Sequence, residues 1–123
     1  MEKIYSFEKL KVWEESRVFV KWIYKTTESF PVSERFGLGG QLRRASVSVV
    51  SNLAEGSARK SAKDQAHFFQ IAYSSLIEVL NQLIVSTDLG FLSTDKLKEG
   101  RTSIELLTPR ISSLRNASLS RNL

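Results

Sequence analysis

The segment from Gln41 to Ser61, QLRRASVSVVSNLAEGSARKS, decides the fold of this chain. On a helical wheel its apolar and small side chains cover an arc of roughly 200°. A helix that is buried only in its own four-helix core needs about half of that arc. The arc is formed by Leu42, Ala45, Ser46, Val47, Val49, Val50, Leu53 and Ala54. The segment therefore predicts a helix with more than one packing partner.

Three other helices are predicted from the apolar spacing and from helix start and stop signals. Phe30 precedes Pro31 and should end the first helix, because a residue before proline is disfavoured in the helical region. Ser61 begins a sequence that resembles a capping box, and Ser93 or Thr94 can cap the last helix. The predicted helices span about residues 8–29, 33–57, 61–87 and 94–116. The second is expected to open with a short turn at Ser33 and Glu34 and to run as a full helix from Leu38.

Two features predict irregularity near the C-terminus. Pro109 lies inside the apolar pattern of the last helix, and an interior proline removes a backbone hydrogen bond. We therefore expect a kink or a break near Pro109. The tail at 117–123 is rich in Ser and Arg and is expected to fray.

Short connections between these four helices predict an all-α, antiparallel up-down-up-down four-helix bundle. The sequence contains no β-type alternation of useful length, no internal repeat and no low-complexity linker. A chain of 123 residues is long enough to bury one core, so a single domain over residues 1–123 is expected.

The composition narrows the possible classes of protein. Hydrophobic residues make up 41% and charged residues 25%, as in ordinary soluble proteins. The absence of cysteine excludes disulfides and thiolate metal sites, and it fits a cytoplasmic location. The longest uninterrupted apolar runs are only a few residues, so no membrane partner is expected.

The net charge of +5 arises within one part of the chain. Between Arg35 and Lys63 there are six bases and a single acid, Glu55, whereas the remaining chain has twelve of each sign. Arginine contacts phosphate with two N–H groups and lysine with a point charge, so this excess predicts a phosphate-binding surface for RNA or DNA. The candidate nucleic-acid-binding residues are Arg43, Arg44, Arg59, Lys60 and Lys63, with Arg17, Lys21 and Lys25 on the first helix. The alternative for the bases of the first helix is an ordinary solvated face.

The polar side of the quoted helix forms a second candidate site. It consists of Gln41, Arg44, Ser48, Asn52 and Glu55. Such a stripe forms either a helix–helix network, in which Glu55 satisfies an arginine, or a surface that holds a partner. A role as an adaptor predicts that Arg44 and Glu55 pair within the chain. Arg43 lies inside the apolar arc, so we expect it at an interface or extended along apolar surface.

The predicted helix at 61–87 also has a broad apolar arc, of roughly 180°. Two such faces exceed what one small bundle buries, which predicts packing against other subunits. The candidate interface residues are Phe19, Trp22, Val47, Val50, Phe69 and Tyr73. The alternative is a broad core within one subunit.

The sequence does not favour an enzyme. His67 is the single histidine, and a catalytic triad or a di-iron site would need partners that the spacing does not supply. The glycines at 37, 39 and 40 do not form a phosphate loop, because the P-loop pattern and its preceding strand are missing. We therefore expect no catalytic residues, no metal and no cofactor.

Several short motifs resemble one known family. They are F-x-x-L-x-V-W (Phe7 to Trp13), F-P (Phe30 and Pro31), G-L (Gly37 and Leu38), Q-L-R-R-A-x-V-S-V (Gln41 to Val49), N-L-A-E-G (Asn52 to Gly56) and S-L-x-E (Ser75 to Glu78). With these motifs the chain resembles the four-helix-bundle proteins encoded in intervening sequences of bacterial 23S ribosomal RNA genes. The last predicted helix carries none of them.

The resemblance implies an up-down bundle that assembles into a homopentameric ring. It also implies a distant similarity to the accessory proteins of diversity-generating retroelements, basic bundles that associate with reverse transcriptase and nucleic acid. A reverse transcriptase-like partner is therefore implied as well. Taken together, we expect a non-enzymatic, oligomeric bundle that binds RNA or DNA through phosphates. The alternative is a protein–protein adaptor or scaffold whose basic and polar faces serve assembly or an acidic protein partner.

Overall fold

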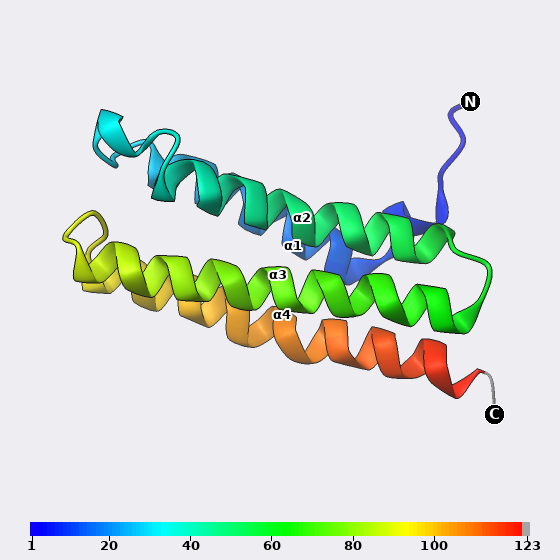
Figure 1. Ribbon diagram of the computed structural model, residues 1–123. Coiled ribbons are helices and arrows are strands. Elements are labelled where there is room, and N and C mark those ends of the chain that lie inside the picture. The colour runs from blue at the N-terminus through cyan, green and yellow to red at the C-terminus, as the bar shows by residue number, and fades with distance from the viewer. Residues whose placement is uncertain (122–123) are drawn as a thin grey trace.

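The computed structural model describes residues 1–121, most of which form four long helices (Figure 1). They are α1 (Lys11–Thr27), α2 (Leu38–Ala58), α3 (Ala62–Asp88) and α4 (Thr94–Ser120), with short 3-10 helices at Ser6–Lys9 and Val32–Glu34. Successive helices run in opposite directions, and no strand occurs within residues 1–121. The predicted all-α, up-down-up-down four-helix bundle is therefore confirmed.

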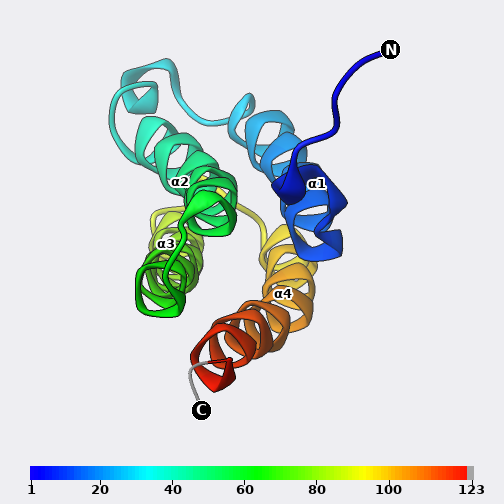
Figure 2. The same cartoon turned by 90° about the vertical axis from the view of Figure 1, so that its right-hand side faces the viewer.

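The four helices surround one core in their chain order (Figure 2). α2 packs extensively against α3, and α3 against α4, whereas α1 and α4 pack most sparsely among the neighbouring pairs. The largest fully buried apolar side chains come from all four helices: Ile23, Leu42, Leu53, Leu76, Leu83, Leu107 and Ile111. The bundle is thus tightly closed around α3 and loosely closed between α1 and α4.

Serine caps begin the last two helices where the sequence predicts them. The Ser61 hydroxyl accepts the backbone N–H of Asp64 at 3.1 Å, and the Ser93 hydroxyl accepts that of Lys96 at 3.1 Å. Each oxygen satisfies one of the N–H groups that the start of a helix leaves unpaired. The two predicted capping positions are confirmed.

The first helix begins later than expected, whereas the second begins at Leu38 after a short turn, as predicted. The stretch Ser6–Lys9 forms a separate 3-10 turn, so α1 starts at Lys11 rather than near residue 8. α2 starts at Leu38, whose N–H donates to the Glu34 carboxylate at 3.0 Å. Gly37, with φ −93° and ψ −125°, is not helical and separates the second 3-10 turn from α2.

The C-terminal helix has no break and extends further than expected. α4 continues through Pro109 without a break and extends to Ser120. Pro109 and Glu105 are exposed, so the Glu105 carbonyl can bond to water in place of the N–H that proline lacks. Residues 117–120 are therefore helical rather than frayed, while residues 122–123 of the expected tail lie outside the described residues.

Two of the six candidate interface residues belong to the core of the single chain. Phe19 and Phe69 are only 3% and 2% exposed, so their assignment to a subunit interface is wrong. Part of the broad apolar arcs predicted for the second and third helices is buried by other helices of the same chain. The reason is that α2 and α3 each pack against two neighbours.

The other four candidate interface residues retain some accessible surface. Val47 is exposed, and Val50 and Tyr73 are partly buried. Trp22 is also partly buried: its ring stacks on Phe19 at 5.7 Å between centres, and its indole N–H donates to Glu99 at 3.4 Å. Contacts within the chain therefore already hold Trp22.

Two glycines allow neighbouring helices to approach closely. A Cβ atom at Gly56 on α2 would lie 2.6 Å from the Phe69 ring on α3. A Cβ atom at Gly100 on α4 would lie 2.8 Å from a Leu83 methyl group and 2.9 Å from the Trp22 ring. Because cores do not absorb extra volume without strain, a larger residue at either position would push the helices apart.

The helix α3 is long and apolar enough to cross a membrane by length and composition alone, with a mean hydropathy of 1.3 over its most apolar window. In this fold it packs between α2 and α4, and its apolar side chains supply much of the core. A core helix meets the same two criteria, so they do not distinguish it from a membrane span.

Candidate nucleic-acid interface

The basic excess seen in the sequence is divided between the two ends of α2. Arg43 and Arg44, here called the arginine pair, lie in the second turn of α2. Arg59, Lys60 and Lys63, here called the turn cluster, surround the connection between α2 and α3. The helical rise of 1.5 Å per residue places Arg44 about 22 Å from Arg59 along the axis. Charge that is contiguous in sequence is thus separated in space.

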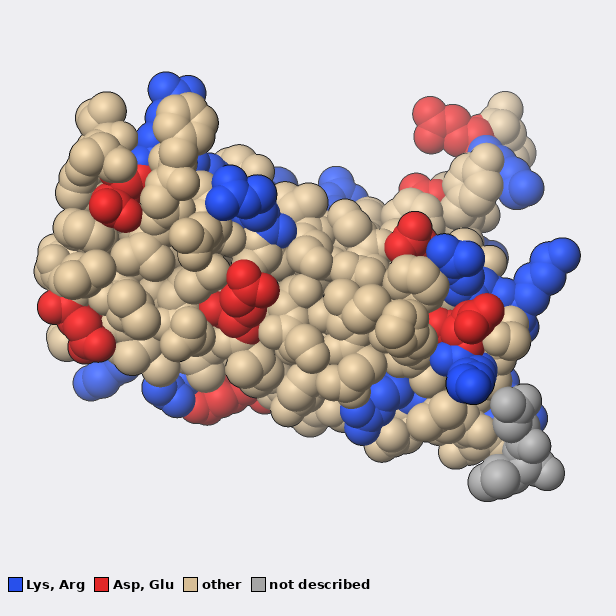
Figure 3. All heavy atoms as spheres, viewed as in Figure 1, with Lys and Arg blue, Asp and Glu red and all other residues tan. Residues whose placement is uncertain are grey.

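Charges of both signs lie on the face formed by α2 and α3 (Figure 3). Near the α2–α3 connection, at the right of the view, acidic and basic side chains alternate. Arg59 lies 3.8 Å from Glu55, and its guanidinium lies 4.4 Å from the centre of the Phe68 ring. Lys60 and Lys63 are exposed. An exposed ion pair contributes about 0.5 kcal/mol, so phosphate can compete with Glu55 for Arg59.

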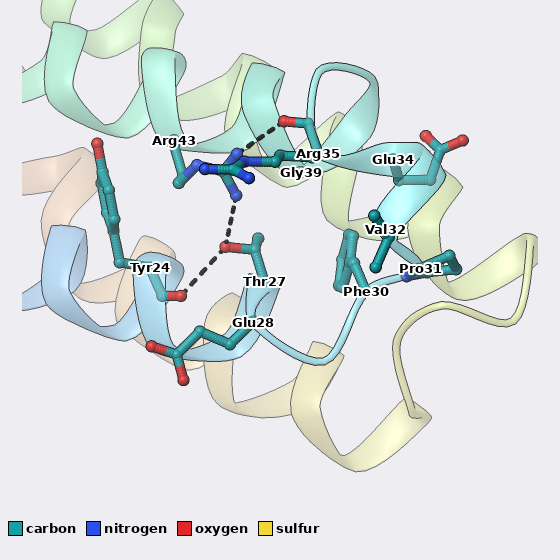
Figure 4. Close-up of a pocket in the computed structure, with 10 residues that line it drawn as sticks. All are labelled: Tyr24, Thr27, Glu28, Phe30, Pro31, Val32, Glu34, Arg35, Gly39 and Arg43. Carbon is teal, nitrogen blue, oxygen red and sulfur yellow. Dashed lines mark hydrogen bonds between the residues drawn. The ribbon is translucent and has the colours of Figure 1, made fainter.

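Arg43 is held in place at the other end of α2 (Figure 4). Its guanidinium donates to the backbone carbonyl of Arg35 at 2.7 Å and to the Thr27 hydroxyl at 3.3 Å. It also lies 5.9 Å from the centre of the Tyr24 ring on α1. These contacts connect α1, the α1–α2 connection and α2. Arg43 is therefore only partly exposed, and its partners belong to its own chain.

The remaining candidate bases project into solvent. Arg44, Arg17, Lys21 and Lys25 are exposed, and none of them forms an ion pair within the described residues. The Arg17 guanidinium lies 5.3 Å from the centre of the Trp13 ring. This arrangement is that of a solvated basic face, and it leaves the charges free to meet an anion.

Three residues of the polar arc form hydrogen bonds in the seam between α2 and α3. The Ser48 hydroxyl lies 2.9 Å from the Ser75 hydroxyl on α3, and the Asn52 amide donates to the Ser48 carbonyl at 2.8 Å. The Gln82 amide on α3 donates to the side-chain oxygen of Gln41 at 3.4 Å. Of the two interpretations of this arc, the helix–helix network is therefore present for Gln41, Ser48 and Asn52.

The predicted pairing of Arg44 with Glu55 is wrong. The two residues lie on one helix at a separation of about 16 Å along its axis. Side chains on one helix meet only when they are three or four residues apart. Glu55 instead pairs with Arg59, one turn further along the chain. Neither Arg44 nor Glu55 takes part in the seam between α2 and α3.

The α3 residues of this seam, Ser75 and Gln82, are not among the predicted site residues. Ser75 and Gln82 are buried although both are polar. A polar residue within an apolar arc is a usable signal, because a buried polar group almost always has a hydrogen-bond partner. Thr27, which holds Arg43, follows the same rule at the end of α1.

Within residues 1–121, no three His, Asp or Glu side chains are placed together to hold a metal ion. His67 is exposed and lies edge-on to the Phe68 ring at 5.5 Å between centres. Polar contacts between helices also occur outside the α2–α3 seam, between Glu15 and Arg110 and between Gln70 and Arg115.

The fold and these surfaces define a class, the small basic four-helix bundles. The family model for 23S rRNA-intervening sequence proteins matches residues 8–113. The chain belongs to that family. The match confirms the resemblance seen in the motifs and extends it into α4. A search of curated proteins gave no match. The distant similarity to retroelement accessory proteins stays a prediction.

Proposed function

We propose that this protein is a non-enzymatic helical bundle that binds RNA or DNA through phosphate groups. The observation that supports this most strongly is the state of the six bases between Arg35 and Lys63. Within residues 1–121 only Arg59 among them forms an ion pair. The others retain charge and N–H donors for phosphate oxygens, and each neutralised phosphate releases counterions.

We further propose that several copies assemble in the cytoplasm, with a homopentameric ring as the assembly that the family resemblance implies. Val18 and Leu106 are 61% and 48% exposed, and they flank a groove of about 320 Å³ between α1 and α4. This is where the bundle closes most loosely. Assembly would place the separated basic groups of neighbouring subunits on one extended surface.

A titration of the protein with a structured RNA at low salt tests the proposed function. Each phosphate contact should contribute about −0.7 to −0.9 to the log–log slope of affinity against salt. Arg44→Ala should weaken binding whatever the sequence of the RNA, because Arg44 is exposed and unpaired in the described residues. Arg101→Ala, an exposed change on α4, is the matched control. Absence of binding at low salt would overturn the proposal.

A protein–protein scaffold is the second candidate function, and the groove between α1 and α4 is the observation that favours it. The two candidates predict different solution masses. A nucleic-acid binder gains the mass of the RNA when RNA is added. A scaffold forms the same assembly with and without RNA, and Leu106→Glu should disperse it.

A further inference from the structure

The cleft at the start of α2 has features that general attraction to phosphate does not require. Its volume is about 390 Å³, at the lower end of the range of small-molecule sites. Its main lining residues are Tyr24, Thr27, Phe30, Val32, Arg35 and Arg43 (Figure 4). A cleft of this size accepts one nucleotide-sized group and excludes a double helix.

One side of the cleft presents an immobilised cation. Two N–H groups of Arg43 are used by the Arg35 carbonyl and the Thr27 hydroxyl, and a guanidinium has five such donors. The side chain is already ordered, so an anion that binds here loses little additional entropy. Arg35 lies beside it in the same opening (Figure 4). The cleft can therefore take a phosphate in a fixed position.

Two acidic residues also line the cleft, but neither neutralises the Arg43 guanidinium. The Glu34 carboxylate accepts the Leu38 N–H at 3.0 Å and so caps α2. Glu28 is exposed. Figure 4 shows both carboxylates directed away from the Arg43 guanidinium. Neither acid forms an ion pair with Arg43 within the described residues.

The cleft also presents apolar and aromatic surface, with Tyr24 beside Arg43 and Val32 across the opening (Figure 4). Tyr24 is 47% exposed although it adjoins the cleft, and Val32 at the rim is 89% exposed. An aromatic ring next to a cation fits a planar base that is joined to a phosphate.

We infer that this cleft binds one unpaired nucleotide of a nucleic-acid strand, with the base stacked on Tyr24 and the phosphate on Arg43 and Arg35. The inference rests on the proposed function and deepens it, because it names the form of nucleic acid preferred. A nucleotide within a duplex does not fit, since its neighbours cover both faces of its base. The turn cluster makes no such distinction and attracts paired and unpaired strands alike.

The test compares a fully paired RNA duplex with the same duplex carrying one bulged nucleotide, at constant salt. The protein should bind the bulged duplex about tenfold more tightly, as expected for one stacked base. Tyr24→Leu should remove this preference, and Tyr24→Phe should keep it, because only the ring is needed. Lys63→Ala, at the far end of α2, should weaken both complexes equally. Circular dichroism of each variant checks that the bundle remains folded.

The outcomes separate this inference from the proposed function. If neither RNA binds, the proposed function fails. If both bind equally, or if Tyr24→Leu keeps the preference, the inference is overturned while phosphate binding stands. A free nucleotide carries the same base and phosphate as a nucleotide within a strand. A parallel titration with UMP, with uridine and inorganic phosphate as references, tests whether the cleft binds it. Tyr24-dependent binding of UMP without a preference between the duplexes would assign the cleft to a free nucleotide and overturn the strand inference.

Discussion

The two ends of α2 have similar charge but are held by different forces. At its start, hydrogen bonds to Thr27 and Arg35 fix Arg43. At its end, Gly56 lets the Phe69 ring pack against the backbone, while the lysines of the turn cluster extend into solvent. Hydrogen bonds thus hold one cation at the start of α2, its polar end, whereas the lysines beyond Gly56, at its packed end, are exposed. Similar formal charge gives one preorganised cation and one solvent-exposed group.

Breaking the packed end should have the largest effect. Gly56→Leu places a side chain where a Cβ alone would lie 2.6 Å from the Phe69 ring, so α2 and α3 must move apart. Such overpacking should lower the free energy of unfolding by about 3 kcal/mol, measured by urea denaturation. Ser51→Leu, at an exposed position on α2, should change it by less than about 0.5 kcal/mol. Equal effects of the two variants would contradict the close helix contact.

Breaking the polar end should have a smaller effect. Arg43→Met keeps the length of the side chain but removes its two hydrogen bonds, which should lower the free energy of unfolding by about 1.5 kcal/mol. Arg44→Met, the adjacent exposed change, should alter it by less than about 0.5 kcal/mol. Thermal denaturation of both variants measures the difference. If Arg44→Met proves the more destabilising, the structural role assigned to Arg43 is wrong.

The solvent-exposed lysines of the turn cluster should affect the salt dependence of binding rather than the stability of the fold. The double variant Lys60→Ala/Lys63→Ala should flatten the log–log slope of RNA affinity against salt by about 1.6. Lys98→Ala/Arg101→Ala removes two exposed charges from α4 and is the matched control. Binding measured between about 50 and 200 mM salt gives both slopes. Identical slopes would place the phosphate contacts away from the turn cluster.

The smallest effect is expected from the exposed ion pair at the same end. Arg59 and Glu55 lie 3.8 Å apart with side chains 44% and 56% exposed. Arg59→Ala should therefore change the free energy of unfolding by about 0.5 kcal/mol or less. Denaturation at low and high salt checks this value. A salt-sensitive loss above about 1.5 kcal/mol would mean that this end also depends on polar contacts.

Much of the fold was predictable because its signals are local. Ser61 and Ser93 cap the helices that follow them, since a hydroxyl three residues before a free N–H needs no tertiary partner. The break predicted at Pro109 is absent. The carbonyl that loses its hydrogen bond belongs to Glu105, which is exposed, so water can replace the missing N–H. Phe19 and Phe69 were assigned to a subunit interface but are buried in the core. A helical wheel gives the width of an apolar arc but not the number of helices that pack against it.

The candidate site was predictable as a set of residue types and not as an arrangement. Arg43 and Arg44 are adjacent in sequence, yet one is bound to Thr27 and Arg35 and the other is exposed. Nothing local distinguishes them. Tyr24 comes from α1, and only the folded chain brings it beside Arg43 at the cleft.

By itself the sequence determined four helices, their order, the serine caps and the family, because periodicity, capping and motifs act over a few residues. Only the tertiary structure decided which side chains are buried and how the basic residues are distributed. It separated the arginine pair from the turn cluster by the length of α2, and it brought Tyr24 and Thr27 of α1 to Arg43. The physical reason is that burial and long-range hydrogen bonds depend on which helices are neighbours, and packing sets that only when the whole chain folds.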